Sequence, residues 1–253
     1  SLRIFNRAEF AETPLGLNDE KLRILLVTAS PGSLSPIDVR TEERMLRFVL
    51  SEYPGLDNVE LQIISNTDVN SLRDRLFLFK PHIVHVACHG GFDSENSLGF
   101  IVLSRPGDSE RHDLVHAFRF ATILSEVGGI QLVFLNACHG AAPGTISAFS
   151  GVAQCIHAVG VPAVVALQFL LLDKSAHAIV LNFYKSLLRD QCTVEESVTR
   201  VRRYLFLNDY HYRECFGLSL FQSNRSLQWP HGLPTERVTA PEALVKKFEE
   251  NQQ

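Results

Sequence analysis

The chain has 253 residues, of which 45% are hydrophobic and 21% are charged, and its formal net charge is −4. These values fit one large globular domain and give no indication of the clustered basic surface that direct nucleic-acid binding requires. No run approaches 18 consecutive apolar residues, and the start lacks the long apolar stretch of a secretory signal, so we expect neither a membrane span nor an export signal.

Short runs rich in Val, Ile and Leu predict strands along the chain, and apolar residues at helical spacing predict helices between them. In chain order we expect a strand at 21–29, a helix at 40–53, a strand at 59–65, a helix at 68–79, strands at 82–88 and 98–104 (the latter one arm of a hairpin), a helix at 114–127, a strand at 130–137, a helix at 145–159, a strand at 161–167, helices at 176–189 and 194–207, and a strand at 217–222. This alternation predicts a three-layer α/β sandwich, with a mostly parallel sheet of about six strands and helices on both faces.

The composition changes at both ends of the chain. Residues 1–20 show no clear periodicity, and the sequence from Ser226 onward contains several prolines and a charged, Gln-rich end. We therefore expect an N-terminal extension at 1–20, one α/β domain at 21–225, and a linker or tail at 226–253. The Pro-containing tail and the missing initial Met are both consistent with a linker to another domain.

The cysteines are five in number, widely spaced, and include no Cys-x-x-Cys pair. An odd number without paired spacing predicts free thiols in a reducing cytoplasm, rather than disulfides or a zinc site. We expect no metal and no cofactor. In such a protein, a cysteine that lies near a histidine distant in the sequence is a candidate nucleophile.

Two of the predicted strands end in residues that could perform chemistry. The strand at 82–88 is followed by His89 and Gly90, and the strand at 130–137 is followed by Cys138. Ligands of an open parallel sheet bind beyond the carboxyl ends of its strands. If the two strands are neighbours, His89 and Cys138 face each other at one edge of the sheet.

A thiol beside an imidazole has a specific chemical use. The imidazole of His89 could take the proton of Cys138 and later give it to a leaving amine. The backbone N–H groups of Gly90 and Cys138 would be the donors that stabilise an oxyanion. The simpler interpretation is that a cysteine at a strand end is only part of the core, since cysteine is among the most buried residue types.

Other polar residues near these strand ends are weaker candidates. Gln168 follows the strand at 161–167 and could contact a substrate backbone, while His139 either lines the pocket or is simply exposed. His85 and His89 are four residues apart on a predicted strand, which is too far for them to share one metal ion. His85 is expected to be a buried or supporting histidine, and the alternative is that it orients the dyad. Cys88 should point away from His89 and into the core.

Several blocks of the sequence resemble the CHAT peptidases, which are grouped with caspases, separases, gingipains and clostripain. HIVHVACHGG (82–91) and LVFLNACHGA (132–141) are similar to the family's His and Cys blocks. Further similarity follows in order along the chain, and in total it covers about 21–222. The further blocks are SGVAQCIHAVGVPAVVALQ (150–168), Asp173 with NFYKSLL (182–188), and EESVTRVRRYL (195–205).

The resemblance implies a caspase-like fold and a cysteine endopeptidase that needs no cofactor. His89 would be the general acid and base, Cys138 the nucleophile, and Gly90 an oxyanion donor. Asp173 matches the position of an aspartate that binds a basic P1 residue in separase-like relatives, which predicts cleavage after Arg or Lys. An equally weighted alternative is that Asp173 only caps the helix that follows it.

The resemblance also bears on partners and regulation. CHAT domains resemble modules of larger bacterial signalling and defence proteins, so we expect a protein substrate and activation by a regulatory partner or fused domain. A serine esterase or a nucleotide-binding module is not supported, because the chain contains no Gly-x-Ser-x-Gly, Gly-x-Gly-x-x-Gly or P-loop motif. The alternative that stays open is a catalytically silent caspase-like scaffold that acts as a protein-interaction module.

Overall fold

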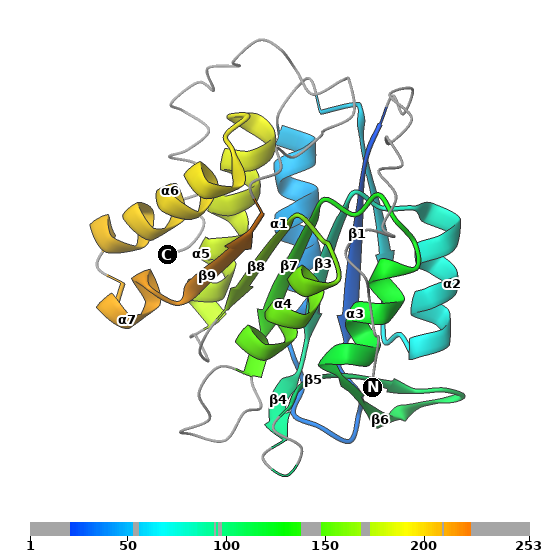
Figure 1. Cartoon of the computed structure of the whole chain (residues 1–253). Coiled ribbons are helices and arrows are strands. Elements are labelled where there is room, and N and C mark those ends of the chain that lie inside the picture. The colour runs from blue at the N-terminus through cyan, green and yellow to red at the C-terminus, as the bar shows by residue number, and fades with distance from the viewer. Residues whose placement is uncertain are drawn as a thin grey trace.

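A six-stranded sheet forms the centre of the computed structural model, in the order β2-β1-β3-β7-β8-β9 (Figure 1). The structure describes residues 21–52, 56–93, 95, 98–137, 148–167, 173–208 and 210–223. The first five strands of this order run parallel, and β9 runs antiparallel to β8. The strands span Leu22–Ala29 (β1), Val59–Ile64 (β2), Ile83–Cys88 (β3), Leu132–Ala137 (β7), Ala163–Leu167 (β8) and Leu218–Gln222 (β9).

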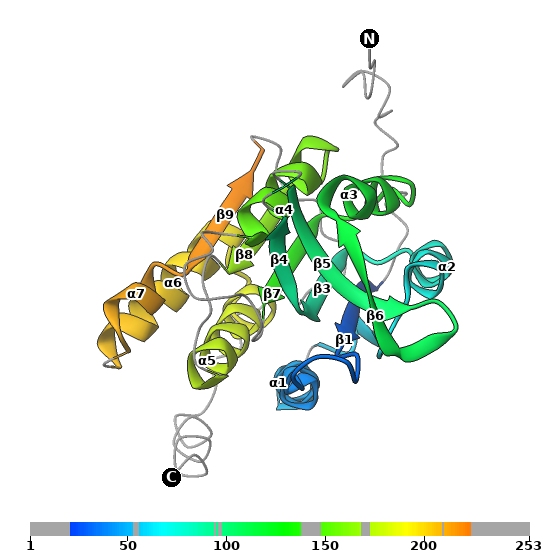
Figure 2. The ribbon, with the colours of Figure 1, turned by 90° about the horizontal axis from the view of Figure 1, so that it is seen from below.

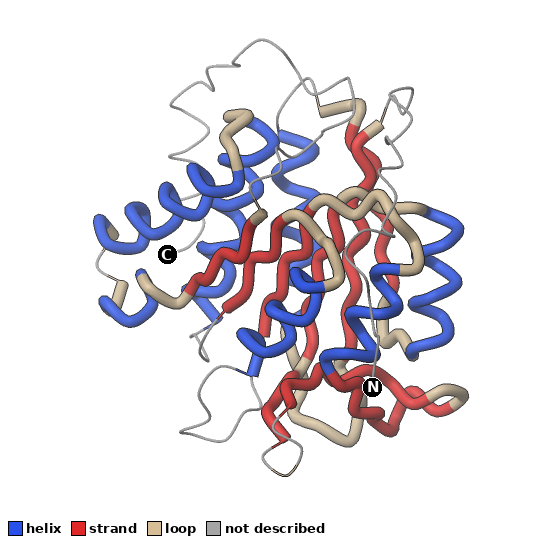
Figure 3. Tube along the Cα trace, in the orientation of Figure 1, coloured by secondary structure: helices blue, strands red, loops and turns tan. Residues whose placement is uncertain are grey.

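Helices cover both faces of this sheet, as Figures 2 and 3 show. One face carries α2 (Val69–Phe79), α3 (Ala117–Ser125) and α4 (Ala148–Ala158). The other face carries α1 (Val39–Glu52), α5 (Asp173–Tyr184) and α6 (Val194–Leu207). A π-helical turn, Lys185–Arg189, continues α5, and the short α7, Tyr212–Cys215, precedes β9. The predicted three-layer sandwich with a mostly parallel six-stranded sheet is therefore confirmed.

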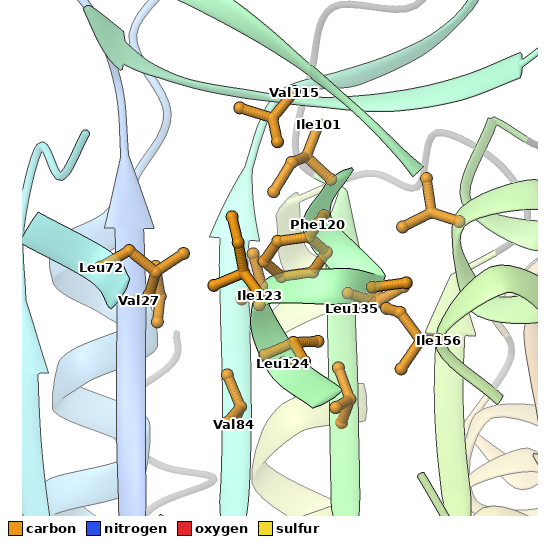
Figure 4. Packing of buried hydrophobic residues seen from close by; sticks show 14 of the residues in the cluster. Val27, Leu72, Val84, Ile101, Val115, Phe120, Ile123, Leu124, Leu135 and Ile156 are labelled. Atoms are coloured by element: carbon orange, nitrogen blue, oxygen red, sulfur yellow. The ribbon is translucent and has the colours of Figure 1, made fainter. Parts of the chain in front are cut away.

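The inner strands β1, β3, β7 and β8 read as nearly continuous apolar runs because both of their faces are buried. Along β1, Leu25 and Val27 pack toward α2 and α3, whereas Ile24 and Leu26 pack toward α1 and α5. The sheet thus separates two hydrophobic cores, one on each face. Figure 4 shows the core on the side of α2 and α3, in which Phe120 of α3 lies among side chains of the central sheet and of a second, smaller sheet. Within the described segments, every helix is too short or too polar to cross a bilayer.

The smaller sheet is antiparallel and follows His89 directly. It consists of β4 (Gly90–Asp93), β5 (Leu98–Arg105) and β6 (Asp108–His116), in that order. The predicted hairpin arm at 98–104 is thus confirmed as β5. The predicted helix at 114–127 is wrong at its start, because 114–116 belong to β6 and α3 begins only at Ala117.

The turn between β5 and β6 has a clear local cause. Pro106 precedes Gly107, whose φ of 78° lies in the left-handed region that favours glycine. The proposed N-terminal extension at 1–20 and the proposed tail at 226–253 both lie entirely outside the described residues.

Candidate active site

The carboxyl ends of β3 and β7 lie side by side, as the sequence predicted. The two strands are parallel neighbours, and the last pair in their register is Cys88 with Ala137. His89 is the next residue after β3, and Cys138 is the next residue after β7 in the sequence. Cys138 itself lies outside the described residues. The pairing of the His89 imidazole with the Cys138 thiol therefore stays a prediction.

The ring of His89 is buried and fixed by a backbone carbonyl. Its Nε2 lies 2.8 Å from the carbonyl oxygen of Ser35, and the His89 carbonyl accepts a hydrogen bond of 2.8 Å from the N–H of Val102. Because a carbonyl oxygen can only accept, the proton of the neutral ring sits on Nε2. Nδ1 then carries the lone pair, and it has no hydrogen-bond partner in the described part of the chain.

The loop that carries Ser35 joins β1 to α1 and is braced at several points. Ser30 accepts a hydrogen bond from the N–H of Ile37 at its side-chain oxygen (3.1 Å). The N–H of Ser33 donates to the carbonyl of Glu110 in β6 (2.9 Å). The hairpin of the smaller sheet therefore supports the loop whose carbonyl orients His89.

A buried polar cluster, which was not predicted from the sequence, lies beneath the two strand ends. Glu42 of α1, His85 of β3, Asn136 of β7 and Tyr184 of α5 are all fully buried. The Asn136 side-chain amide donates to Glu42 Oε1, and His85 Nε2 lies 3.0 Å from Glu42 Oε2. This second contact is close but does not have the direction of a hydrogen bond. His85 is buried, as the sequence predicted.

The far side of the cluster is closed by aromatic rings. His85 Nδ1 lies 3.0 Å from the hydroxyl of Tyr184, and the His85 ring stacks on Phe134 with 4.8 Å between centroids. Burial, together with the nearby Glu42 carboxylate, raises the pKa of Tyr184 well above its ordinary value. Tyr184 therefore keeps its proton and serves as a neutral hydrogen-bonding group.

Comparison with known proteins places the chain in a family. The family model of the CHAT domain matches residues 24–228. The chain belongs to the CHAT domain family. No curated protein matches it. Two caspases are similar in structure to the CHAT domain: caspase-1 from Spodoptera frugiperda (10% identity, 80% of this chain and 86% of that chain covered, TM-score 0.48) and the Drosophila initiator caspase Dronc (8% identity, 72% of each chain covered, TM-score 0.45).

The thiol of Cys88 is part of the core of the CHAT domain. It is fully buried on the face of the sheet that carries α2, α3 and α4, and burial raises its pKa to about 12. A thiol in this state is protonated at neutral pH and unreactive. Cys88 is therefore excluded as a nucleophile, as the sequence predicted.

The predicted oxyanion donor, Gly90, opens β4 immediately after His89 and pairs with Ile101 of β5. At the neighbouring position, a Cβ on Gly91 would come within 2.3 Å of the Phe100 ring, so the side chain of this β5 residue occupies the space over Gly91. The structure thus places Gly90 beside His89. Its role as an oxyanion donor stays a prediction.

The predicted substrate-binding residues are placed only in part. Asp173 is the first residue of α5, which follows β8, but its side chain is not among those described. His139 and Gln168 lie outside the described residues. Among the residues that the structure does describe, no three metal-ligating side chains gather into a cluster.

Proposed function

We propose that this CHAT domain is a cysteine endopeptidase that cleaves protein substrates with His89 and Cys138 as its dyad. The observation that carries the proposal is the state of His89. Its Nε2 is committed to the Ser35 carbonyl, which leaves the Nδ1 lone pair as a base at the end of β3. The register of β3 with β7 supports Cys138, the next residue after Ala137, as the thiol that this base serves.

In this mechanism the dyad performs acyl transfer in two stages. The Cys138 thiol gives its proton to His89 Nδ1, and the thiolate attacks the scissile carbonyl carbon. The N–H groups of Gly90 and Cys138 would stabilise the oxyanion that forms. The His89 imidazolium then protonates the leaving amine, and water, deprotonated by the same ring, hydrolyses the thioester. The Ser35 carbonyl holds the ring in one tautomer throughout, which is the role of the third group in a catalytic triad.

We further propose that cleavage follows a basic P1 residue, with Asp173 as the carboxylate that pairs with it and with Gln168 and His139 as further substrate contacts. A panel of fluorogenic peptides that differ only at P1 tests both the activity and this preference. We expect Arg and Lys peptides to be cleaved, and Asp173→Asn to lower their kcat/KM about tenfold or more, because a charged hydrogen bond to P1 is lost.

The matched control for this experiment is Asp74→Asn, which removes an exposed carboxylate on α2, away from β8 and α5. It should leave kcat/KM unchanged. A strong preference for acidic or apolar P1 residues would refute the basic specificity while leaving the peptidase proposal intact. Cleavage of none of the peptides would favour the silent scaffold that binds other proteins.

We also propose that a regulatory partner or a fused domain controls the site, in a cytoplasmic signalling or defence system of bacteria. The contact between β6 and the loop that carries Ser35 supports this proposal, since a partner that moves this hairpin would also move the His89 support. We expect the isolated chain to cleave peptides slowly. If the purified chain cleaved peptides at its full rate without any activator, this control would be contradicted.

A further inference from the structure

Glu42 occupies a position where a carboxylate is costly. It is fully buried on the face of α1 that also carries Leu46 and Val49, both of them in the core. A buried carboxylate is destabilising unless it is paired and hydrogen-bonded, and an apolar replacement of a buried ion pair is often neutral or stabilising. Stability of the fold therefore gives no sufficient reason for a carboxylate at this position.

The two oxygens of Glu42 reach two different strands. Oε1 accepts a hydrogen bond from Asn136 of β7, and Oε2 lies 3.0 Å from Nε2 of His85 in β3. His85 is itself held by the hydroxyl of Tyr184 and by its stacking on Phe134. The carboxylate therefore lies beside a buried, hydrogen-bonded imidazole, and through its hydrogen bond with Asn136 it can hold the end of β7 in place.

The same stretch of chain also supports the other strand end. Seven residues before Glu42, the carbonyl of Ser35 bonds to the ring of His89, immediately after β3. Between them, Asp38 fixes the start of α1 by accepting a hydrogen bond from the N–H of Thr41 (3.1 Å). Residues 35–42 thus contact β7 through a side chain and the end of β3 through a carbonyl.

We propose that Glu42 is a positioning residue of the peptidase: through Asn136 it fixes the carboxyl end of β7, and with it the backbone from which the nucleophile extends. The inference rests on the proposed function, because it assigns Cys138 as that nucleophile. Asn136 precedes Ala137, the last residue of β7 and the register partner of Cys88. A shift of this strand end changes the geometry between base and thiol without changing the residues that bind substrate.

A double-mutant cycle in the full chain tests the proposal. Glu42→Leu and Asn136→Leu should each lower kcat about a hundredfold with KM nearly unchanged, the loss that a misplacement of about 1 Å produces. Because both changes break the same contact, the double variant should lose no more than either single variant. Glu42→Gln, whose amide oxygen can still accept from Asn136, should retain most of the activity.

The control variant is Val198→Ala, which truncates a buried residue of α6 in the same core cluster as α1 but away from the strand ends. It should lower the thermal midpoint and leave kcat unchanged. Losses in the double variant that multiply, or an equal fall of kcat in Val198→Ala, would overturn the proposal, because Glu42 would then act only through general stability.

A second measurement does not require peptidase activity. The rate at which iodoacetamide alkylates Cys138, followed by mass spectrometry, should fall about fivefold or more in Glu42→Leu but not in Val198→Ala, since thiol reactivity depends on the pairing with the imidazole. If the wild type cleaves no peptide and this difference is still seen, the proposed function fails and the positioning role stands. Equal alkylation rates in all three proteins overturn the positioning role.

Discussion

Cys138→Ala is expected to lower kcat/KM for peptide hydrolysis by at least about a thousandfold, because the proposed mechanism then has no nucleophile to form the thioester. His89→Ala should have a loss of similar size, and the two losses should not add, since the dyad acts as a unit. Initial rates with a fluorogenic peptide, compared at equal concentrations of folded protein, measure both effects.

Labelling with a thiol-reactive peptide ketone distinguishes loss of chemistry from loss of binding. We expect the wild type to be labelled at Cys138 and not at Cys88, whose buried thiol has a pKa of about 12. Cys155→Ala is the matched control; burial raises the pKa of this half-buried thiol, and its removal should leave labelling unchanged. Equal labelling of wild type and Cys138→Ala would reject Cys138 as the nucleophile, and an unlabelled wild type would favour the scaffold.

Phe120→Ala is expected to lower the free energy of unfolding by about 3–5 kcal/mol, the usual cost of a large cavity in a core. Phe120 is fully buried in α3, and its ring lies among Leu135 of the central sheet and Ile101 and Val115 of the smaller sheet (Figure 4). The cavity would therefore weaken the attachment of the smaller sheet as well as that of the helix. Urea unfolding followed by circular dichroism, with linear extrapolation, measures the change.

The matched control for Phe120 is two residues away in the same helix. The side chain of Phe118 is 61% exposed, so Phe118→Ala removes the same ring from water rather than from the core and should change the free energy of unfolding by less than about 0.5 kcal/mol. Similar losses in the two variants would mean that the phenyl ring acts through helix α3 alone, and not through the core that joins the two sheets.

The sheet could be predicted because its inner strands are buried on both faces, so that β3 and β7 stand out as apolar runs with chemically reactive residues directly after them. That these two strands are neighbours was a condition of the site hypothesis, and the pairing of β3 with β7 meets it. The strand β6 was missed because most of its residues are polar and exposed, which removes the alternation that identifies a half-buried strand.

The supports of the candidate site could not be predicted in the same way. Ser35 contributes its backbone carbonyl, and because every residue has one, the sequence does not indicate which carbonyl will bond to His89. An acidic residue in the first turn of a helix, such as Glu42, is ordinarily explained by the helix dipole and by solvent. Its contact with Asn136 joins residues 94 positions apart, and no local pattern reports a contact at that distance.

The pairing of β3 with β7 joins segments that leave the ribosome at different times. When β3 has been made, the imidazole and its Ser35 support already exist, but the smaller sheet and α3 must follow before β7 can dock beside it. Contacts between distant segments form late in folding because the intervening chain must first be ordered. A polypeptide that stops before β7 would therefore carry the proposed base without the proposed nucleophile, so that the proposed dyad becomes complete only when synthesis has passed residue 138.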